Sequence, residues 1–185
     1  HFLSWVVVGA MVTNMFANSG SINQVIALLG GGRINFLAST DSFRPLLYVS
    51  ANWKEAGWSA IIYMATITGL DPALYEAATV DGANRLQQTW YVTIPGISST
   101  IVVLLILAVG RMMNAGFDQI FNLQNSAVKG VSEIIDTYIY NITFRTTPDY
   151  GFSTAVGMFK SVINFTMLLL ANTLVKRISG KGLFA

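Results

Sequence analysis

The sequence predicts an all-α fold, a polytopic transmembrane helix bundle. Of its 185 residues, 53% are hydrophobic and only 11% are charged, and the mean hydropathy is +0.54. A soluble globule of this composition would have more apolar surface than it is able to hide. Long apolar runs recur along the chain with polar segments between them. We therefore expect a single transmembrane domain, residues 1–185, that lies in a bilayer.

Four runs are candidates for crossing a membrane, for which about 20 apolar residues are needed at a rise of 1.5 Å each. In chain order they are residues 2–17, 46–69, 97–116 and 152–175. The first run is short and begins at His1, without an initiator Met or a basic flank. We therefore expect that this sequence is truncated at its N-terminus.

The polar segment between the second and third runs, residues 71–96, carries several helix signals. Asp71 suits the N-cap of a helix, and Pro72 suits its first turn, where a missing N–H is not needed. These signals predict a short helix over about 72–80. Gly82 fits the left-handed position that ends such a helix. The segment is thus expected to fold as a helix, a sharp turn and a second helical turn.

Small residues and a proline shape the same loop. Ala77 and Ala78, directly after Glu76, leave room for the surface of another protein to approach closely. Taken alone, Glu76 is explained as an acid near a helix N-terminus, where the macrodipole favours it. Pro95 is expected to block continuation of the helix that follows the Gly82 turn. These features favour a folded docking loop.

The spacing of these residues resembles the cytoplasmic loop signature of ATP-binding-cassette (ABC) importer permeases. That signature reads Glu-Ala-Ala, three residues, Gly, nine residues, Ile-x-Leu-Pro. The chain supplies Glu76-Ala77-Ala78, Gly82 and Val92-Thr93-Ile94-Pro95 at this spacing, with Val and Ile as conservative departures. Residues 53–58 and 114–121 resemble the carbohydrate-importing subfamily, especially permeases for complex or acidic oligosaccharides. The resemblance covers nearly the whole chain.

The resemblance implies the type I ABC importer permease fold, with six spans in the full chain and about four in this sequence. It places residues 71–96 and a basic tail, residues 176–185, on the cytoplasmic side of a bacterial inner membrane. The positive-inside rule does not decide this orientation, because four basic residues fall on each side. Residues 18–45 and 117–151 are then expected to face outward, with 22–29 as a short amphipathic helix at the surface.

The resemblance also implies what the loop does. It would sit in a cleft of a separate ATPase subunit, where Glu76 is positioned to pair with a basic residue. This chain is then a transport subunit and no enzyme, with no catalytic site and no cofactor of its own, since ATP and Mg belong to the partner ATPase subunits. The predicted coupling residues are Glu76, Ala77, Ala78, Asp81, Gly82, Ala83, Arg85 and Pro95.

The implied partners are a second permease subunit in a heterodimer, two ATP-binding subunits, an extracytoplasmic solute-binding protein and membrane lipid. The substrate would be an oligosaccharide. Nucleic acid is not expected as a partner, because the net charge of +2 is small and spread out. With no cysteine, and His1 as the only histidine, no metal site is expected.

Ionisable residues within the runs are candidates for the substrate pathway, because a charge at membrane depth usually faces a cavity or a partner. Lys54 and Glu55 do not share a helix face, so one is expected to point into the pathway and the other toward the surface. Lys160 and Asn164, four apart, do share a face. That face suits a lumen or a helix interface.

Arg111, Asn114 and Asp118 are expected on roughly one side of the third run, as a polar set in its outer half. Sugars bind by stacking on aromatic rings and by dense hydrogen bonding, so nearby rings join the candidates. The predicted pathway residues are Lys54, Trp58, Tyr63, Arg111, Asn114, Phe117, Asp118, Lys160 and Asn164.

Several of these pathway candidates also have a purely structural explanation. Trp and Tyr residues are more often membrane-interface anchors than sugar platforms. Arg111 is explained as well by snorkelling or by a pair with Asp118. Lys160 fits an internal ion pair as well as the pathway. The three cations Lys54, Arg111 and Lys160 would favour an acidic sugar, which is a hypothesis.

Other functions remain open at this stage. An importer permease for another solute is compatible with the motif, which says nothing about cargo. A channel outside the ABC class, or a structural membrane subunit, fits the hydropathy but gives no reason for the spaced motif. A membrane enzyme would need a buried nucleophile with a base, or a carboxylate cluster, and the runs contain neither.

Overall fold

The computed structural model describes residues 2–114, 116–145 and 148–179, and within these ranges its regular elements are all helices. The predicted tail lies outside the described residues from position 180 onward, and so does His1. The chain forms two compact units. Unit 1 is His1–Gly57 with Asn114–Gly157, and unit 2 is Trp58–Met113 with Met158–Ala185.

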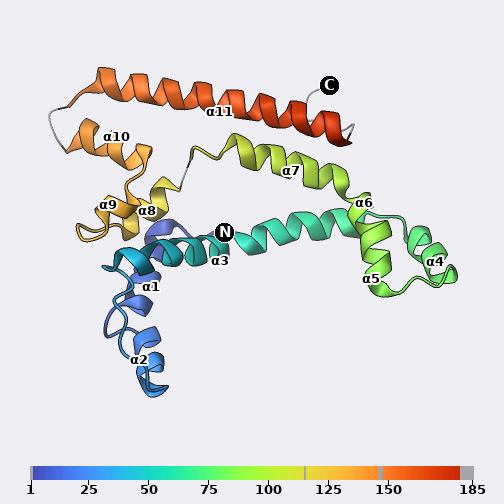
Figure 1. Cartoon of the computed structure of the whole chain (residues 1–185), viewed down its shortest axis with the longest axis horizontal. Helices are drawn as coiled ribbons and strands as arrows, with labels where there is room; N and C mark the ends of the chain where they lie inside the picture. Colours follow the sequence, from blue (N-terminus) through green and yellow to red (C-terminus); the bar gives the residue numbers. More distant parts are fainter. Residues whose placement is uncertain (1, 115, 146–147, 180–185) are drawn as a thin grey trace. The chain divides into compact units, whose positions relative to one another are not determined.

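Unit 1 is built around a small apolar core. Its elements are α1 (Trp5–Phe16), α2 (Ser21–Leu28), α8 (Phe117–Leu123), α9 (Lys129–Ser132), α10 (Ile135–Phe144) and the first parts of α3 (Thr40–Thr68) and α11 (Tyr150–Ser179) (Figure 1). Helix α1 packs against α8 and α2, and α8 also packs against α10. The buried core residues are Val8, Val12, Phe43, Leu46, Leu123 and Val128.

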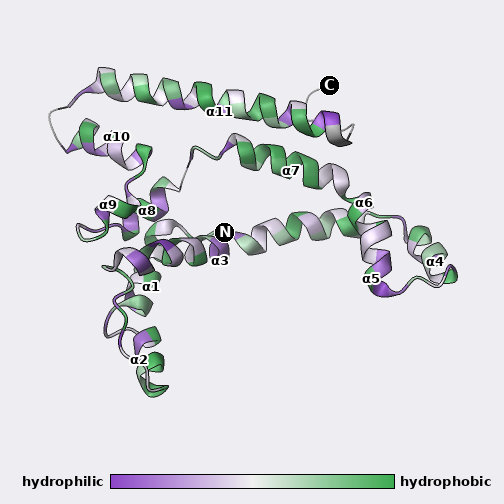
Figure 2. Cartoon of the chain, viewed as in Figure 1, coloured by the Kyte–Doolittle hydropathy of each residue, from purple (hydrophilic) through white to green (hydrophobic). Residues whose placement is uncertain are grey.

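Unit 2 holds the predicted docking loop and two apolar helices. Its elements are the remaining parts of α3 and α11, with α4 (Pro72–Val80), α5 (Arg85–Gln88), the π-helical η1 (Thr89–Thr93), α6 (Ile94–Gly96) and α7 (Ser98–Gly110) (Figure 1). Figure 2 shows that α7 is hydrophobic along nearly its whole length. On α11, the rings of Phe159 and Phe165 are exposed. Apolar side chains that face outward in this way suit a lipid environment.

One helix in the described part of the chain is long and apolar enough to cross a membrane, Tyr150–Arg177 in α11. A second candidate is a bent pair, Arg85–Gly96 and Ser98–Gly110, whose axes differ by 63°. The four predicted runs overlap α1, α3, α7 and α11, with different bounds. Helices α1 and α7 contain only 12 and 13 residues, too short to qualify alone.

The third predicted run, residues 97–116, is helical only as far as Gly110, so its predicted end is wrong. The N–H of Arg111 bonds to the carbonyl of Ala108 at 3.2 Å, and the N–H of Met112 bonds to that of Val109 at 3.1 Å, which tightens the last turn. Farther along, Gly116 has φ +73°, a left-handed conformation that a continuous helix does not contain. Met112 and Met113 keep the segment after the helix end partly apolar, so hydropathy alone did not place that end at Gly110.

The predicted helix over 22–29 is present as α2, and its anchor is a buried asparagine. The side chain of Asn23 is fully buried. Its Nδ2 donates to the carbonyls of Ala17 at 3.0 Å and Ile34 at 2.8 Å. Its Oδ1 accepts the N–H of Ile34 at 2.8 Å. One side chain thus ties the two loops that flank α2.

We expect Asn23→Ala to destabilise the protein by at least about 1–3 kcal/mol, the usual effect of leaving one buried polar group unsatisfied. Three backbone groups lose their partner in this variant. The measurement is thermal unfolding of the purified protein in mild detergent. Asn14→Ala, on an exposed position of α1, is the matched control and should unfold at the wild-type temperature. Equal unfolding temperatures for wild type and Asn23→Ala would show that water replaces the hydrogen bonds of Asn23.

Candidate functional site: an exposed helix–turn–helix loop

Helix α4 begins and ends where the sequence predicts. Asp71 is its N-cap, and the carboxylate accepts the N–H of Ala73 at 2.9 Å. Pro72 occupies the first helical position, where no N–H is required. Helix α4 buries no residue and lies at the surface of unit 2. The loop is therefore ordered by its own local signals rather than by burial.

The turn after α4 is a Schellman motif. The N–H of Ala83 bonds to the carbonyl of Ala78 at 2.9 Å, and the N–H of Gly82 bonds to that of Thr79 at 3.0 Å. Gly82 has φ +80°, and a Cβ placed there would meet no atom within 4 Å. The glycine is thus required by its backbone conformation and not by lack of space. The predicted left-handed turn is confirmed.

A second helix starts directly after this turn. Asn84 caps α5 through a reciprocal pair, since its Oδ1 accepts the N–H of Gln87 at 3.0 Å and Gln87 Oε1 accepts the N–H of Asn84 at 2.8 Å. This capping box fixes the direction in which the chain leaves the turn. Arg85, the first residue of α5, is exposed.

The prediction that Pro95 stops this helix is wrong. The helical path runs from α5 through η1 and α6 to Gly96. A proline ring clashes with the carbonyl four residues earlier and supplies no N–H. Directly before Pro95 the helix widens to the π register, with the N–H of Ile94 bonded to Thr89. The wider turn accommodates the proline, and the sharp bend of 63° follows after Gly96.

Side-chain bonds join α4 to the helix that follows. Gln88 Nε2 donates to Thr79 Oγ1 at 3.0 Å and to the Ala83 carbonyl at 3.2 Å. The hydroxyls of Tyr75 and Thr93 lie 2.9 Å apart. These contacts join the two helices of the loop, one close to the Gly82 turn and the other farther from it. A loop held by such bonds is expected to move as a rigid unit.

The outer surface of this loop carries charged side chains with apolar side chains near them. Glu76 is exposed and makes no hydrogen bond or ion pair with the described residues. Ala77, Asp81 and Pro95 are also exposed, whereas Ala78 and Ala83 are half-buried. Exposed apolar side chains lie near them, namely Leu74, Val80, Leu86, Trp90 and Tyr91. A carboxylate among apolar neighbours suits a protein interface.

Among the pathway candidates, Lys54 and Glu55 do not diverge as predicted. Lys54 Nζ lies 2.9 Å from Glu55 Oε1 and 5.2 Å from the centre of the Trp5 ring. Their backbone positions do point apart on α3, but two long side chains curl around the helix and meet. The Lys54 side chain is nearly buried, and that of Glu55 is half-exposed.

The predicted polar set of Arg111, Asn114 and Asp118 does not share one helix face, because no single helix contains all three. Arg111 caps α7 in unit 2, while Asn114 and Asp118 belong to unit 1. Asp118 stands in the first turn of α8, where the macrodipole favours an acid. The prediction failed because it assumed that one helix continues to residue 116, whereas α7 ends at Gly110.

Lys160 and Asn164 lie on the continuous helix α11, four residues apart, as predicted. Lys160 is only 8% exposed. Asn164 Oδ1 is buried and accepts no hydrogen bond from the described residues. Buried polar atoms rarely stay unpaired in a native protein. This amide is therefore consistent with a ligand or a partner subunit that completes the site.

The aromatic candidates differ in their surroundings. Phe117 stacks on Phe121 at 5.3 Å and lies 5.9 Å from the ring of Tyr140, so it belongs to a packed aromatic cluster. Trp58 is exposed, and Tyr63 is half-buried on α3. Their roles in a pathway stay predictions. No group of three or more His, Asp or Glu side chains within the described ranges is arranged to hold a metal ion.

The family described as "Binding-protein-dependent transport system inner membrane component" matches residues 2–180. The polygalacturonan/rhamnogalacturonan transport system permease protein YteP of Bacillus subtilis (strain 168) is 44% identical over the whole chain. Protein LplB of the same organism is 42% identical, again over the whole chain. The chain spans only 57% and 58% of these two relatives.

Two solved structures are similar to the chain. One is a bacterial alginate ABC transporter in complex with an alginate pentasaccharide-bound periplasmic protein, with TM-score 0.94 and 37% identity over 99% of this chain and 64% of that one. The other is a bacterial ABC transporter involved in import of the acidic polysaccharide alginate, with TM-score 0.92 and 37% identity over 97% and 63%.

Proposed function

The chain belongs to the family of binding-protein-dependent transport system inner membrane components, and from this premise we propose that it is a permease subunit of an ATP-driven oligosaccharide importer. The observation that supports the proposal best is the braced loop of α4, the Gly82 turn and α5. It is ordered and exposed, and its helix α4 carries the Glu76 carboxylate, which has no partner among the described residues. Those are the properties that a coupling element needs.

In the proposed mechanism, α4 inserts into a cleft of a separate ATPase subunit, and Glu76 pairs with a basic residue there. The small residues Ala77 and Ala78 allow close approach. ATP and Mg bind to the ATPase subunits, whose closure moves the loop. Because Gln88 and Tyr75 brace the loop, the movement passes to the membrane helices as a rigid-body motion. The pathway then opens alternately to either side.

The proposed assembly contains a second permease subunit, two ATPase subunits and an extracytoplasmic binding protein. The similar alginate transporter was solved with a periplasmic protein bound, which supports the last of these. We place the subunit in a bacterial inner membrane as a multi-pass protein, with the loop of residues 71–96 and the tail of residues 176–185 in the cytoplasm.

The proposed cargo is an oligosaccharide that carries carboxylates. The names of the similar proteins support this, since polygalacturonan and alginate are both acidic polysaccharides. The cations Lys54, Arg111 and Lys160 agree in sign with such a cargo. If removing Arg111 and Lys160 slows uptake of neutral and acidic oligosaccharides equally, their role in recognising acidic sugars is rejected.

The test is mass spectrometry of the intact complex, captured through this chain in mild detergent, with identification of any saccharide that co-purifies. We expect a second permease and two ATPase copies. A reconstituted complex should also hydrolyse ATP faster when the sugar-loaded binding protein is added. Recovery of this chain alone, under conditions that preserve other membrane assemblies, would favour a channel instead.

A further inference from the structure

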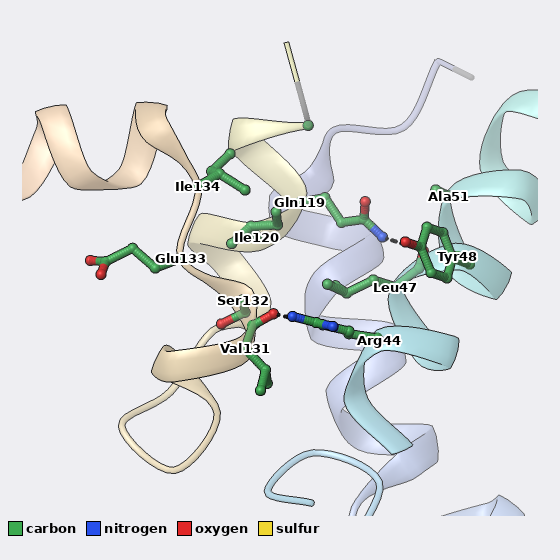
Figure 3. Close-up of a pocket in the computed structure, with 11 residues that line it drawn as sticks. Arg44, Leu47, Tyr48, Ala51, Gln119, Ile120, Val131, Ser132, Glu133 and Ile134 are labelled. Atoms are coloured by element: carbon green, nitrogen blue, oxygen red, sulfur yellow. Dashed lines mark hydrogen bonds between the residues drawn. The ribbon is translucent and has the colours of Figure 1, made fainter. Parts of the chain in front are cut away.

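Unit 1 contains a pocket of about 550 Å³, within the range of small-molecule sites (Figure 3). It lies between α3, α8 and the segment around α9. None of the nine predicted pathway residues lines it. The lining residues are Arg44, Leu47, Tyr48, Ala51, Gly116, Gln119, Ile120, Val131, Ser132, Glu133 and Ile134.

The cation in this pocket is held in a fixed orientation. Arg44 Nε donates to the carbonyl of Val131 at 3.0 Å, as Figure 3 shows. That bond uses the single Nε–H and leaves both Nη groups without a hydrogen bond to the described residues. No described carboxylate lies within ion-pair distance of Arg44. The pocket therefore presents an exposed guanidinium whose Nε bond to Val131 orients its two Nη groups.

Glu133, the acid that lines the pocket, is not the counter-ion of Arg44. The Glu133 carboxylate points away from Arg44 in Figure 3. Its Oε1 lies 3.5 Å from Lys129 Nζ and accepts a bond from Asn141 Nδ2 at 3.4 Å. Lys129 thus offsets the charge of this acid.

Two further polar side chains line the pocket. Gln119 is buried, and its Nε2 donates to the Leu47 carbonyl at 2.7 Å and to Ser50 Oγ at 2.9 Å. Its Oε1 accepts no bond from the described residues and stays available to a hydroxyl. Tyr48 is 69% exposed and offers both a ring and a phenol. Leu47 and Ile120 supply an apolar floor.

We propose that this pocket is a binding subsite for a carboxylated sugar residue, with Arg44 as its anion anchor. The proposal rests on the proposed function as an oligosaccharide importer and adds a site to it. A guanidinium fork matches a carboxylate through two parallel, charge-assisted bonds. Gln119 Oε1 accepts from a ring hydroxyl, and Tyr48 covers the apolar face of the sugar. A uronate satisfies all three groups together.

The test uses the complete transporter, with its ATPase subunits and binding protein, reconstituted into liposomes. The probes are tetragalacturonate and its carboxyl-reduced, neutral counterpart. Arg44→Gln should raise the half-saturating concentration for uptake of tetragalacturonate about tenfold or more, as expected when charge-assisted bonds are lost. Uptake of the neutral probe should stay within about twofold of wild type, since only the carboxylate contact is removed.

Two variants serve as controls. Arg44→Lys keeps the charge and a donor for Val131 but loses the fork, so an intermediate effect on tetragalacturonate is expected. Arg33→Gln removes a cation from an exposed loop of unit 1 that does not line the pocket, and both probes should behave as in wild type. Direct binding of tetragalacturonate to the permease complex, without binding protein, should weaken only in the Arg44 variants.

Equal losses for both probes in Arg44→Gln would overturn the proposal and assign the residue to the fold of unit 1. Weaker docking of the sugar-free binding protein, with unchanged sugar binding, would overturn it too and make this face a protein interface. If the wild-type complex takes up neither probe, while its binding protein binds both, the proposed function itself fails, and this subsite fails with it.

Discussion

Gly82→Val is expected to uncouple ATP hydrolysis from transport while leaving the protein folded and inserted in the membrane. Gly82 stands at φ +80°, where a non-glycine residue costs roughly 1–2 kcal/mol and a β-branched one more. A shift of this size changes an equilibrium by about tenfold. Because the Schellman bonds of Gly82 and Ala83 set the angle between α4 and α5, we expect that the strained loop does not fit the proposed ATPase cleft.

The measurement is ATPase activity of the reconstituted complex with and without the sugar-loaded binding protein. We expect stimulation to fall at least about tenfold in Gly82→Val, in proportion to the conformational penalty. Gly82→Asn is the matched control, because asparagine tolerates the left-handed region, and it should retain most of the stimulation. Full stimulation in the valine variant would disprove the coupling role of this turn.

Glu76→Lys is expected to weaken binding of the ATPase subunit on the order of a hundredfold, about 2.7 kcal/mol. The carboxylate is exposed on α4 and has no partner among the described residues, so the loss does not come from the fold of this chain. Like charges placed opposite each other at an interface are unfavourable by several kcal/mol. The affinity of the purified permease for its ATPase subunit measures the effect directly.

Asp41→Lys provides the control for charge reversal as such. Asp41 is also an exposed acid near a helix N-terminus, on α3 of unit 1 and outside the loop. The Asp41→Lys variant should leave the affinity of the permease for the ATPase subunit unchanged. Thermal unfolding of both variants should match wild type. Were Glu76→Lys to assemble normally, the carboxylate would serve only to stabilise the first turns of α4.

The loop was predictable from sequence because its signals act over a few residues. Asp71 and Pro72 begin α4, and Gly82 ends it, each through a backbone requirement that does not depend on distant contacts. Pro95 was predicted wrongly because two outcomes are compatible with a proline in a helix. Either the helix stops, or the preceding turn widens, and the π register of η1 shows the second.

Apolar character was a poorer guide to helix ends and side-chain directions. Met112 and Met113 extend the apolar run past Gly110, yet the helix ends there, so Arg111 and Asp118 lie on different elements. Lys54 and Glu55 meet because flexible side chains reach around a helix, although their backbone positions diverge. Periodicity describes where a Cβ points, and it says little about where a long side chain ends.

The membrane character of this protein, its helical class and the local fold of its 71–96 loop were predictable from the sequence, because composition and short-range backbone preferences decide those. Only the tertiary structure revealed the pocket around Arg44. That site depends on a bond to Val131, 87 residues away, and on Gln119 reaching Leu47, 72 residues away. No period or spacing in the sequence encodes such pairs, since the packing of α3, α8 and α9 brings them together.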